Sequence, residues 1–265
     1  MDRVKSLLSK GYFPSQLPPC FNSESLANLY QHAYPYWLTL QIQPKKGTSL
    51  VPKSPETKSE IFSVSRAGLQ RRITSITNPV AQTYLATAIG QHWGDILKQY
   101  RQSSLSRSRP RFLKNASRAA NIPSMHVLYD LKLDKSVGYR FMLKTDISRF
   151  FPTIYTHSVP WAIHGKSIAK KNKKVTPKYF GNLIDLALRQ CQDGQTIGLP
   201  IGPDTSHIIA EVISAAIDVE LRKKLKGWPA GFRFVDDYYL FFANRAEAEN
   251  ALAILVRLLQ DLNYN

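Results

Sequence analysis

The stretch Gly231-Phe232-Arg233-Phe234-Val235-Asp236-Asp237-Tyr238-Tyr239-Leu240-Phe241-Phe242 places two adjacent carboxylates inside an aromatic run. Residues 232–236 and 238–242 each have the pattern of a β-strand, which predicts two strands joined by a tight turn. Bare carboxylates in an apolar neighbourhood are costly unless a positive group compensates them. Because Mg²⁺ prefers carboxylate oxygens, the pair indicates a metal site. Many Asp-Asp pairs simply lie in solvated turns, so the rest of the chain must decide between a metal site and a solvated turn.

A third carboxylate, Asp146, follows another strand-like segment, residues 139–147. Apolar side chains alternate there with Lys144 and Asp146, which predicts a strand with Asp146 on the face opposite Phe141. Carboxylates that converge from rigid strands can hold two metal ions roughly 3.5–4 Å apart, as two-metal phosphoryl transfer requires. We expect Asp146 and Asp236 to bridge the ions and Asp237 to be a weaker third ligand. The alternative is that Asp146 is only a turn residue at a strand end.

The composition is that of a packed globular protein with a large positive charge. The chain has 265 residues, of which 43% are hydrophobic and 11% aromatic, enough for one large domain or two small ones. Its 36 Lys and Arg against 19 Asp and Glu give a net charge of +17, which favours binding to nucleic-acid phosphates. A ribosomal-type or membrane-surface protein is the alternative, although no basic amphipathic membrane helix is evident.

The two cysteines and the hydropathy pattern indicate the cellular compartment of the protein. Cys20 and Cys191 match no zinc or redox spacing, so we expect reduced, structural thiols. The first thirty residues lack the apolar core of a signal peptide, and no stretch is long enough to span a bilayer. We therefore expect a soluble, cytoplasmic protein with no membrane partner.

Helices and loops are predicted from the periodicity of apolar residues and from the positions of proline and helix-capping residues. Residues 24–34 and 246–262 have helical patterns, the second with Leu252 on its core-facing side, and Pro79 suits the first turn of a third helix. A long helix follows residue 204, with Asp204, Thr205 and Ser206 as its capping groups. An apolar stripe on this helix includes Ile208, Ile209, Ile213 and Ile217. Residues 43–60 are expected to form an exposed loop.

Two basic segments are candidates for nucleic-acid contact. Residues 101–118 are rich in Arg and Ser and are interpreted either as a solvated loop or as a phosphate-binding surface. For the lysine-rich run 166–178 a solvated, mobile face is favoured, since blocks of like charge repel.

Three blocks of the chain, in order, resemble motifs of reverse transcriptases. These are Asp146-Ile147-Ser148-Arg149-Phe150-Phe151-Pro152-Thr153-Ile154, then Gly198-Leu199-Pro200-Ile201-Gly202-Pro203, and finally Phe234-Val235-Asp236-Asp237. The resemblance covers roughly residues 60–265. It implies an α+β right-hand polymerase fold with a leader at 1–59, fingers at 60–135 and a palm at 136–265, the antiparallel palm sheet being covered by helices.

The resemblance implies roles for individual residues. Asp146, Asp236 and Asp237 carry over as catalytic metal ligands, joined by the Ile147 carbonyl, with Mg²⁺ or Mn²⁺ as the ion. Phe151 falls where the family places a bulky side chain against a ribose 2′-hydroxyl, which implies use of dNTPs; the alternative is a plain core aromatic.

Nucleotide and nucleic-acid contacts are also implied. Residues 71–76 resemble the fingers strand that presents an arginine to the triphosphate, and Arg72 is favoured over Arg71. Lys144 either touches phosphate or offsets the acidic cluster. The remaining expected contacts are Pro200 and Gly202 to the nucleotide, and Arg107, Arg109, Arg111, Arg118 and Ser206 to nucleic acid.

The chain departs from the family in two ways. Ile201 stands where the family often has Gln, which removes a polar contact to substrate or template. The rest of the palm and the thumb that the resemblance implies have no counterpart up to residue 265, so either the chain is a fragment of a longer protein, which we favour, or another component holds the primer.

The leader segment 11–21 resembles that of bacterial reverse transcriptases of the abortive-infection and defence-associated, antiphage groups. The expected activity is therefore RNA-directed or untemplated DNA synthesis from a primer or protein hydroxyl. Expected partners are an RNA template or noncoding RNA, the DNA product, dNTPs and further copies of the chain. A palm-type RNA polymerase and a catalytically silent nucleic-acid-binding scaffold are the alternatives.

Overall fold

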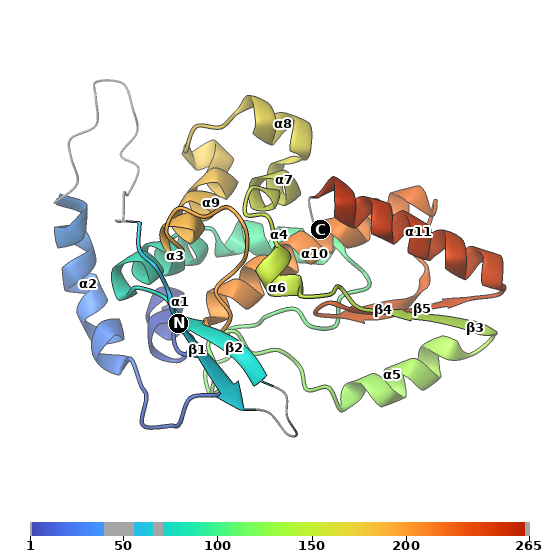
Figure 1. Cartoon of the computed structure of the whole chain (residues 1–265), viewed down its shortest axis with the longest axis horizontal. Coiled ribbons are helices and arrows are strands. Elements are labelled where there is room, and N and C mark those ends of the chain that lie inside the picture. The colour runs from blue at the N-terminus through green and yellow to red at the C-terminus, as the bar shows by residue number, and fades with distance from the viewer. Residues whose placement is uncertain (1, 40–55, 66–70, 263–265) are drawn as a thin grey trace.

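Two small antiparallel sheets are joined by a helical body (Figure 1). The computed structural model describes residues 2–39, 56–65 and 71–262, so most of the loop expected at 43–60 lies outside the described residues. The elements are α1 (Arg3–Ser9), α2 (Glu24–Thr39), β1 (Glu60–Ser65), β2 (Arg71–Ile76), α3 (Pro79–Gln91), α4 (Trp93–Gln102), α5 (Val127–Ser136), β3 (Phe141–Thr145), α6 (Phe150–Thr153), α7 (Ser158–His164), α8 (Lys166–Lys171), η1 (Pro177–Tyr179), α9 (Phe180–Gln190), α10 (Asp204–Lys224), β4 (Ala230–Phe234), β5 (Asp237–Phe242) and α11 (Arg245–Asp261). The α+β class expected from the sequence is confirmed.

The larger sheet has the order β3-β5-β4, with both pairs antiparallel. In Figure 1 the sheet lies between α11 on one side and α5 on the other. Backbone hydrogen bonds from Arg233 to Leu105 and from Arg107 to Arg233 cover the outer edge of β4 with residues 105–107. This matters for the site, because the β4–β5 turn carries Asp236.

The smaller sheet is the hairpin of β1 and β2, in which Val64 pairs with Arg72. Ser75 of β2 donates its N–H to the Ile201 carbonyl at 2.7 Å. The hairpin is thereby attached to the segment that precedes α10.

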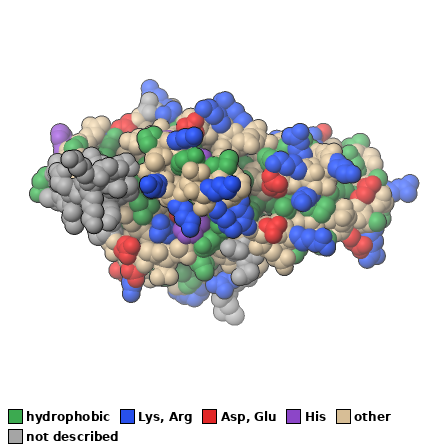
Figure 2. Space-filling view, turned by 90° about the horizontal axis from the view of Figure 1, so that it is seen from above, with side chains coloured by type: hydrophobic (Ala, Val, Ile, Leu, Met, Phe, Trp, Pro, Cys, Tyr) green, Lys and Arg blue, Asp and Glu red, His purple; other side chains and the backbone are tan. Residues whose placement is uncertain are grey.

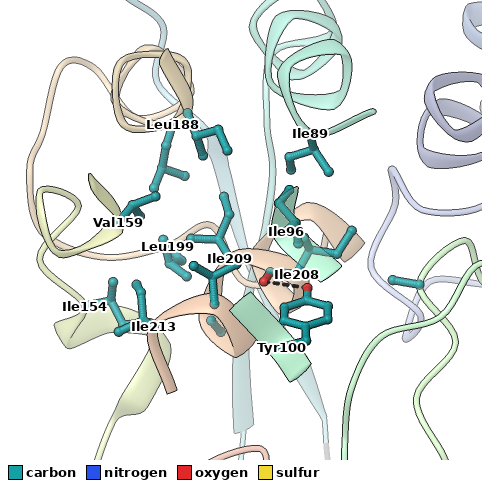
Figure 3. Close-up of a cluster of buried hydrophobic side chains, with 14 of the residues drawn as sticks. Ile89, Ile96, Tyr100, Ile154, Val159, Leu188, Leu199, Ile208, Ile209 and Ile213 are labelled. Atoms are coloured by element: carbon teal, nitrogen blue, oxygen red, sulfur yellow. Dashed lines mark hydrogen bonds between the residues drawn. The ribbon is translucent and has the colours of Figure 1, made fainter. Parts of the chain in front are cut away.

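The main hydrophobic core surrounds α10 (Figure 3). The isoleucines of its apolar stripe, which the sequence pattern predicted, are at most 1% exposed. The helix packs against α4, α7 and α11, and the Tyr100 hydroxyl donates to the Ile208 carbonyl at 2.9 Å. Burial of this stripe supplies the rigid base beneath the site.

Several expected elements differ in detail from those observed. The helix expected at 24–34 continues to Thr39 through Pro35. On α11, Leu252 is 36% exposed, although it was expected in the core. The lysine-rich run 166–178 contains α8 and η1, whose bounds the sequence did not predict. Its lysines are exposed, as expected for a solvated face, and Lys166 and Lys178 also make cation–π contacts with Trp161 and Tyr179.

Positive side chains dominate the face shown in Figure 2, where Lys and Arg are widespread and Asp and Glu are fewer. Both cysteines are free thiols, Cys20 exposed and Cys191 buried. Within the described ranges, no helix has the length and apolar character needed to cross a bilayer.

Candidate active site

The acidic turn is a two-residue connection between β4 and β5. Phe234 pairs with Asp237, which leaves Val235 and Asp236 as the loop. On the other side of β5, Thr145 pairs with Tyr238, so Asp146 leaves β3 at the same end of the sheet. The sheet register therefore brings together the carboxylates that the sequence separates.

Val235 adopts a left-handed conformation with φ of 58°. Glycine usually occupies the first position of such a hairpin loop, and a β-branched residue there is strained. Both backbone groups of Val235 are held: its N–H donates to the Ser108 Oγ and its carbonyl accepts from the Arg233 Nη1, each at 2.7 Å. These contacts determine where the following residue, Asp236, lies.

Arg233 is fully buried and forms ion pairs with two carboxylates of α10. Its guanidinium donates to both oxygens of Glu211 at 3.1 Å and to Asp218 at 2.9–3.1 Å. The Tyr238 hydroxyl also donates to Asp218. Burial opposes the charge, but Asp218 and Glu211 outweigh it and hold the pKa of Arg233 well above its ordinary value.

The carboxylates of the turn repel one another. Burial raises the pKa of Asp236, with Asp237 and Asp146 adding to the effect. Burial and Asp146 also raise the pKa of Asp237, against the opposing charges of Lys144 and Lys132. Among the described residues, none of the ion pairs includes any of these three aspartates. The cluster therefore carries negative charge that a cation would compensate.

A cleft of about 890 Å³ opens in front of the turn. Asp146, Ile147 and Asp236 line one wall, and Arg71 and Arg72 of β2 line another. A ligand with both a metal ion and phosphate groups would fit between walls of opposite charge. Also lining the cleft are Ser15, Gln16, Arg118, Asn121, Arg149, Phe150, Phe151, Gly202, Asp204 and His207.

The two arginines of β2 differ in the hydrogen bonds that their side chains make. Arg71 donates from Nε to the Ser63 Oγ at 2.6 Å and from Nη2 to the Ser63 carbonyl at 3.0 Å. Arg72 makes no side-chain hydrogen bond with the described residues. Within the described structure, its guanidinium is thus available to a ligand in the cleft.

The loop at 198–204 is attached to three distant segments. The Gly198 and Leu199 N–H groups donate to residues of the first block, and the Asp204 N–H donates to the Gly11 carbonyl. Gly202 has φ of 143°, and a Cβ there would lie 2.4 Å from the Pro14 Cγ. The leader is therefore part of the cleft wall, a role that the sequence did not indicate.

The side chain of Arg118 is paired with groups of the protein itself. It forms an ion pair with Asp204 and donates from Nη1 to the Phe13 carbonyl at 2.7 Å. Asp204 also accepts from the Ala120 N–H. The expected capping role of Asp204 is therefore wrong. Pro203 is the N-cap of α10, and no side chain makes a capping hydrogen bond there. The Asp204 carboxylate is instead paired with Arg118.

Ser206, expected to contact nucleic acid and to cap α10, is 1% exposed. Its hydroxyl donates to the Pro200 carbonyl at 2.6 Å, which directs it inward to stabilise the loop. Pro200 lines a neighbouring pocket rather than the cleft. Of the expected loop contacts, only Gly202 lines the cleft itself.

Phe151 and His207 meet inside the cleft with ring centroids 5.1 Å apart. Burial lowers the pKa of His207 to about 4, with Arg118 and Arg72 adding to the effect, so the imidazole is neutral at pH 7. Arg149, with φ of 51°, also lines the cleft. Sequence reasoning missed His207 and Arg149, although both lie within or next to the motif blocks.

Arg107, Arg109 and Arg111 do not line this cleft. They line a second pocket that shares none of its residues. Lys144 points toward the ring of Tyr239 at 5.9 Å and acts electrostatically on Asp237.

The acidic end of the sheet supplies only part of the ligand set of a metal ion. In the described part of the chain, no group of three or more His, Cys, Asp or Glu is arranged so that it could hold an ion unaided. Mg²⁺, however, commonly uses one or two carboxylates and completes its shell with water and substrate phosphates. The mutually repelling, unpaired carboxylates of Asp146 and Asp236 fit that mode of binding.

Comparison with known proteins shows that the fold of this chain is similar to that of a solved structure. Neither a protein-family model nor a curated protein matches the sequence. Among solved structures, the fold is similar to that of apo telomerase from Candida tropicalis truncated from its C-terminal domain, with a TM-score of 0.52 at 12% identity. The match covers 97% of this chain and 56% of the telomerase chain, so the protein spans little more than half of that neighbour.

Proposed function

We propose that this protein is a DNA polymerase of the reverse-transcriptase type that transfers deoxynucleotides from dNTPs to a primer or protein hydroxyl. The observation that carries the proposal is the meeting of Asp146 and Asp236 in one cleft, opposite Arg72. The similarity of fold to a telomerase supports it. Residues 60–135 would be the fingers and residues 136–265 the palm.

Residues that line the cleft, together with Asp237 beside it, have distinct parts in this proposal. Asp146, Asp236 and Asp237, with the Ile147 carbonyl, would hold Mg²⁺ or Mn²⁺. Bound there, the ions supply an activated attacking hydroxyl and neutralise charge on the leaving phosphate. Arg72 would bind the triphosphate through the paired N–H groups of its planar guanidinium, because this group has no partner within the described structure.

Selection of the sugar is assigned to Phe151. Its ring lines the cleft and is braced by His207 on one side and by Phe150, 5.4 Å away, on the other. A braced ring can exclude a 2′-hydroxyl by steric conflict. Phe151→Ala should therefore raise ribonucleotide use relative to deoxynucleotide use by about tenfold or more, while robust ribonucleotide use by the wild type would favour an RNA polymerase.

The biological setting belongs to the same proposal. The leader at 11–21, which resembles that of bacterial antiphage reverse transcriptases, supports a defence role with a dedicated RNA or a protein primer. Ile201 in place of a polar residue supports unconventional template handling. Sequencing of nucleic acid that copurifies with the wild type and with Asp236→Ala would identify a discrete RNA template or protein-attached random DNA.

The decisive experiment is incorporation of labelled dNTPs by the purified chain with Mg²⁺ or Mn²⁺. Asp236→Asn should fold normally and lose activity by at least on the order of a thousandfold, equivalent to about 4 kcal/mol of transition-state stabilisation. Asp95→Asn, at an exposed aspartate of α4, is the matched control and should retain activity. Undiminished incorporation by Asp236→Asn would sink the proposal.

A non-catalytic nucleic-acid-binding scaffold is the second candidate. The net charge of +17 and the lack of a self-sufficient metal-binding group in the described ranges favour it. It predicts salt-dependent nucleic-acid binding by the wild type without incorporation under either metal. The same assay therefore separates the two candidates.

A further inference from the structure

A pocket of about 380 Å³ lies beside β4, away from the cleft. Ser106, Arg107, Arg109 and Arg111 line one side of it, and Phe234 with residues of the 123–131 segment lines the other. We infer that this pocket is a binding site for a phosphate group carried by a nucleotide or a nucleic-acid strand. The inference does not depend on the proposed function, because phosphate binding here requires neither metal nor catalysis.

The charge of the pocket is concentrated and uncompensated. No Asp or Glu is among its lining residues. Burial lowers the pKa of Arg109, and Arg107, Arg233 and Arg111 lower it further against Glu211. Glu211 itself is already bound to Arg233. A guanidinium cluster without a carboxylate partner is the arrangement that proteins use for phosphate oxygens.

Three polar groups in this wall are buried and have no hydrogen-bond partner in the part of the chain that the structure describes. They are the Ser106 Oγ, the Arg107 Nε and the Arg109 Nε. Ser106 is only 3% exposed, so its hydroxyl has no access to bulk solvent. Buried polar groups are normally satisfied, and unpaired ones that cluster call for a missing partner. The acceptor oxygens of a phosphate in the pocket would provide one once these side chains rotate toward it.

The backbone of the segment is held in place, and the Arg109 side chain is held as well, because its Nη2 donates to the Ser103 carbonyl. The Arg107 N–H donates to the Arg233 carbonyl at 2.8 Å, and Arg111 exchanges two 2.9 Å backbone hydrogen bonds with Asn121. Such a wall does not have to be ordered when a ligand arrives, which favours binding.

The opposite wall is apolar and gives the ligand more than a phosphate to contact. Leu128, Leu131 and Phe234 line it. The volume is within the range of small-molecule sites, which combine mostly apolar walls with a few polar groups. A sugar or base attached to the phosphate would cover these side chains, so bare inorganic phosphate should bind more weakly than a nucleotide.

The test uses the purified full chain in EDTA, so that metal-dependent binding in the cleft does not contribute. Calorimetric titration with dAMP should give binding that deoxyadenosine lacks. A short single-stranded oligodeoxynucleotide that displaces dAMP identifies the strand as the source of the phosphate, and its methylphosphonate analogue should not displace it. Binding of dAMP without displacement identifies a free nucleotide. Equal binding of dAMP and deoxyadenosine, or none of either, overturns the inference.

Variants locate the binding. Arg107→Ala and Arg111→Ala should each weaken dAMP binding about tenfold, the loss of one charge-assisted hydrogen bond. Lys114→Ala, at an exposed lysine of the same segment, should change it less than about twofold. Asp236→Asn should bind dAMP as the wild type does, whatever becomes of incorporation. Wild-type affinity in both pocket variants overturns the inference.

A Ser106→Ala variant separates binding from folding. Its Oγ has no hydrogen-bond partner among the described residues, so the thermal midpoint should not fall, yet dAMP affinity should fall severalfold. Unchanged affinity in this variant contradicts the role of Ser106 in the pocket.

Discussion

The Nη1 of Arg233 lies 2.7 Å from the carbonyl oxygen of Val235, across the turn that carries Asp236. The same guanidinium is saturated by Glu211 and Asp218 of α10. A candidate catalytic carboxylate is thereby tied, through one side chain, to the central helix of the core. Groups held in this way keep the sub-ångström placement that metal-dependent chemistry needs.

Removal of Arg233 should destabilise the protein strongly. Arg233→Met leaves two buried carboxylates without their partner, and we expect the free energy of unfolding to fall by about 3–5 kcal/mol in urea titrations. Adding Asp218→Asn and Glu211→Gln should restore part of the loss. Arg245→Met, which breaks an exposed pair with Glu249, is the control and should cost less than about 1 kcal/mol. A comparable loss in both variants would show that burial of the pair is irrelevant.

Neutralising Asp236 should stabilise the metal-free protein at neutral pH. Its folded-state pKa is raised by burial, so the charged form is disfavoured in the folded state. The penalty is absent below the unfolded-state pKa and grows as the pH rises through the folded-state pKa. In EDTA at pH 7, Asp236→Asn should therefore unfold at a higher temperature than the wild type, and the difference should disappear in acid.

Magnesium should reverse that order. At ten times its dissociation constant, Mg²⁺ should stabilise the wild type by about 1.4 kcal/mol and Asp236→Asn by much less. Thermal melts with and without Mg²⁺ measure both effects. Equal stabilisation of the two proteins would mean that the ion binds elsewhere.

Gly202 should tolerate no side chain. Its φ of 143° is unfavourable for any other residue, and a Cβ would meet the Pro14 Cγ at 2.4 Å and the Ser75 carbonyl oxygen at 3.0 Å. We expect Gly202→Ala to cost about 1–3 kcal/mol. Gly94, inside α4 with no atom within 4 Å of its added Cβ, is the matched control. Gly94→Ala should stabilise by about 0.5–1 kcal/mol, so urea titrations should give opposite signs.

His207 should make the protein sensitive to moderate acid. Its pKa of about 4 in the folded state lies below the ordinary value of 6.5, so the unfolded state takes up a proton first. Stability is complete above about pH 6.5 and falls as the pH drops toward 4. At pH 5 the loss should be about 1–2 kcal/mol, allowing for partial exposure to the cleft. His207→Gln should flatten the dependence between pH 7 and pH 5, and an identical slope would rule out His207 as its source.

Local patterns were sufficient for the elements that carry the site. The strands before Asp146 and around Asp236 were predicted from aromatic and alternating residues, and α10 from its apolar stripe, because these periodicities act within a few residues. The cap of α10 was predicted wrongly, since Arg118, far from Asp204 in sequence, competes for the same carboxylate.

By itself, the sequence determined the strands, the central helix and the residue types that can bind metal and phosphate. Only the tertiary structure decided which of them meet: Asp146 and Asp236 share a cleft because β3 and β5 pair in one register, while Arg107 and Arg111 lie in a separate pocket. Hydrogen-bond register and buried ion pairs join residues distant along the chain. Their energies depend on the burial and geometry of the assembled fold, which no local pattern contains.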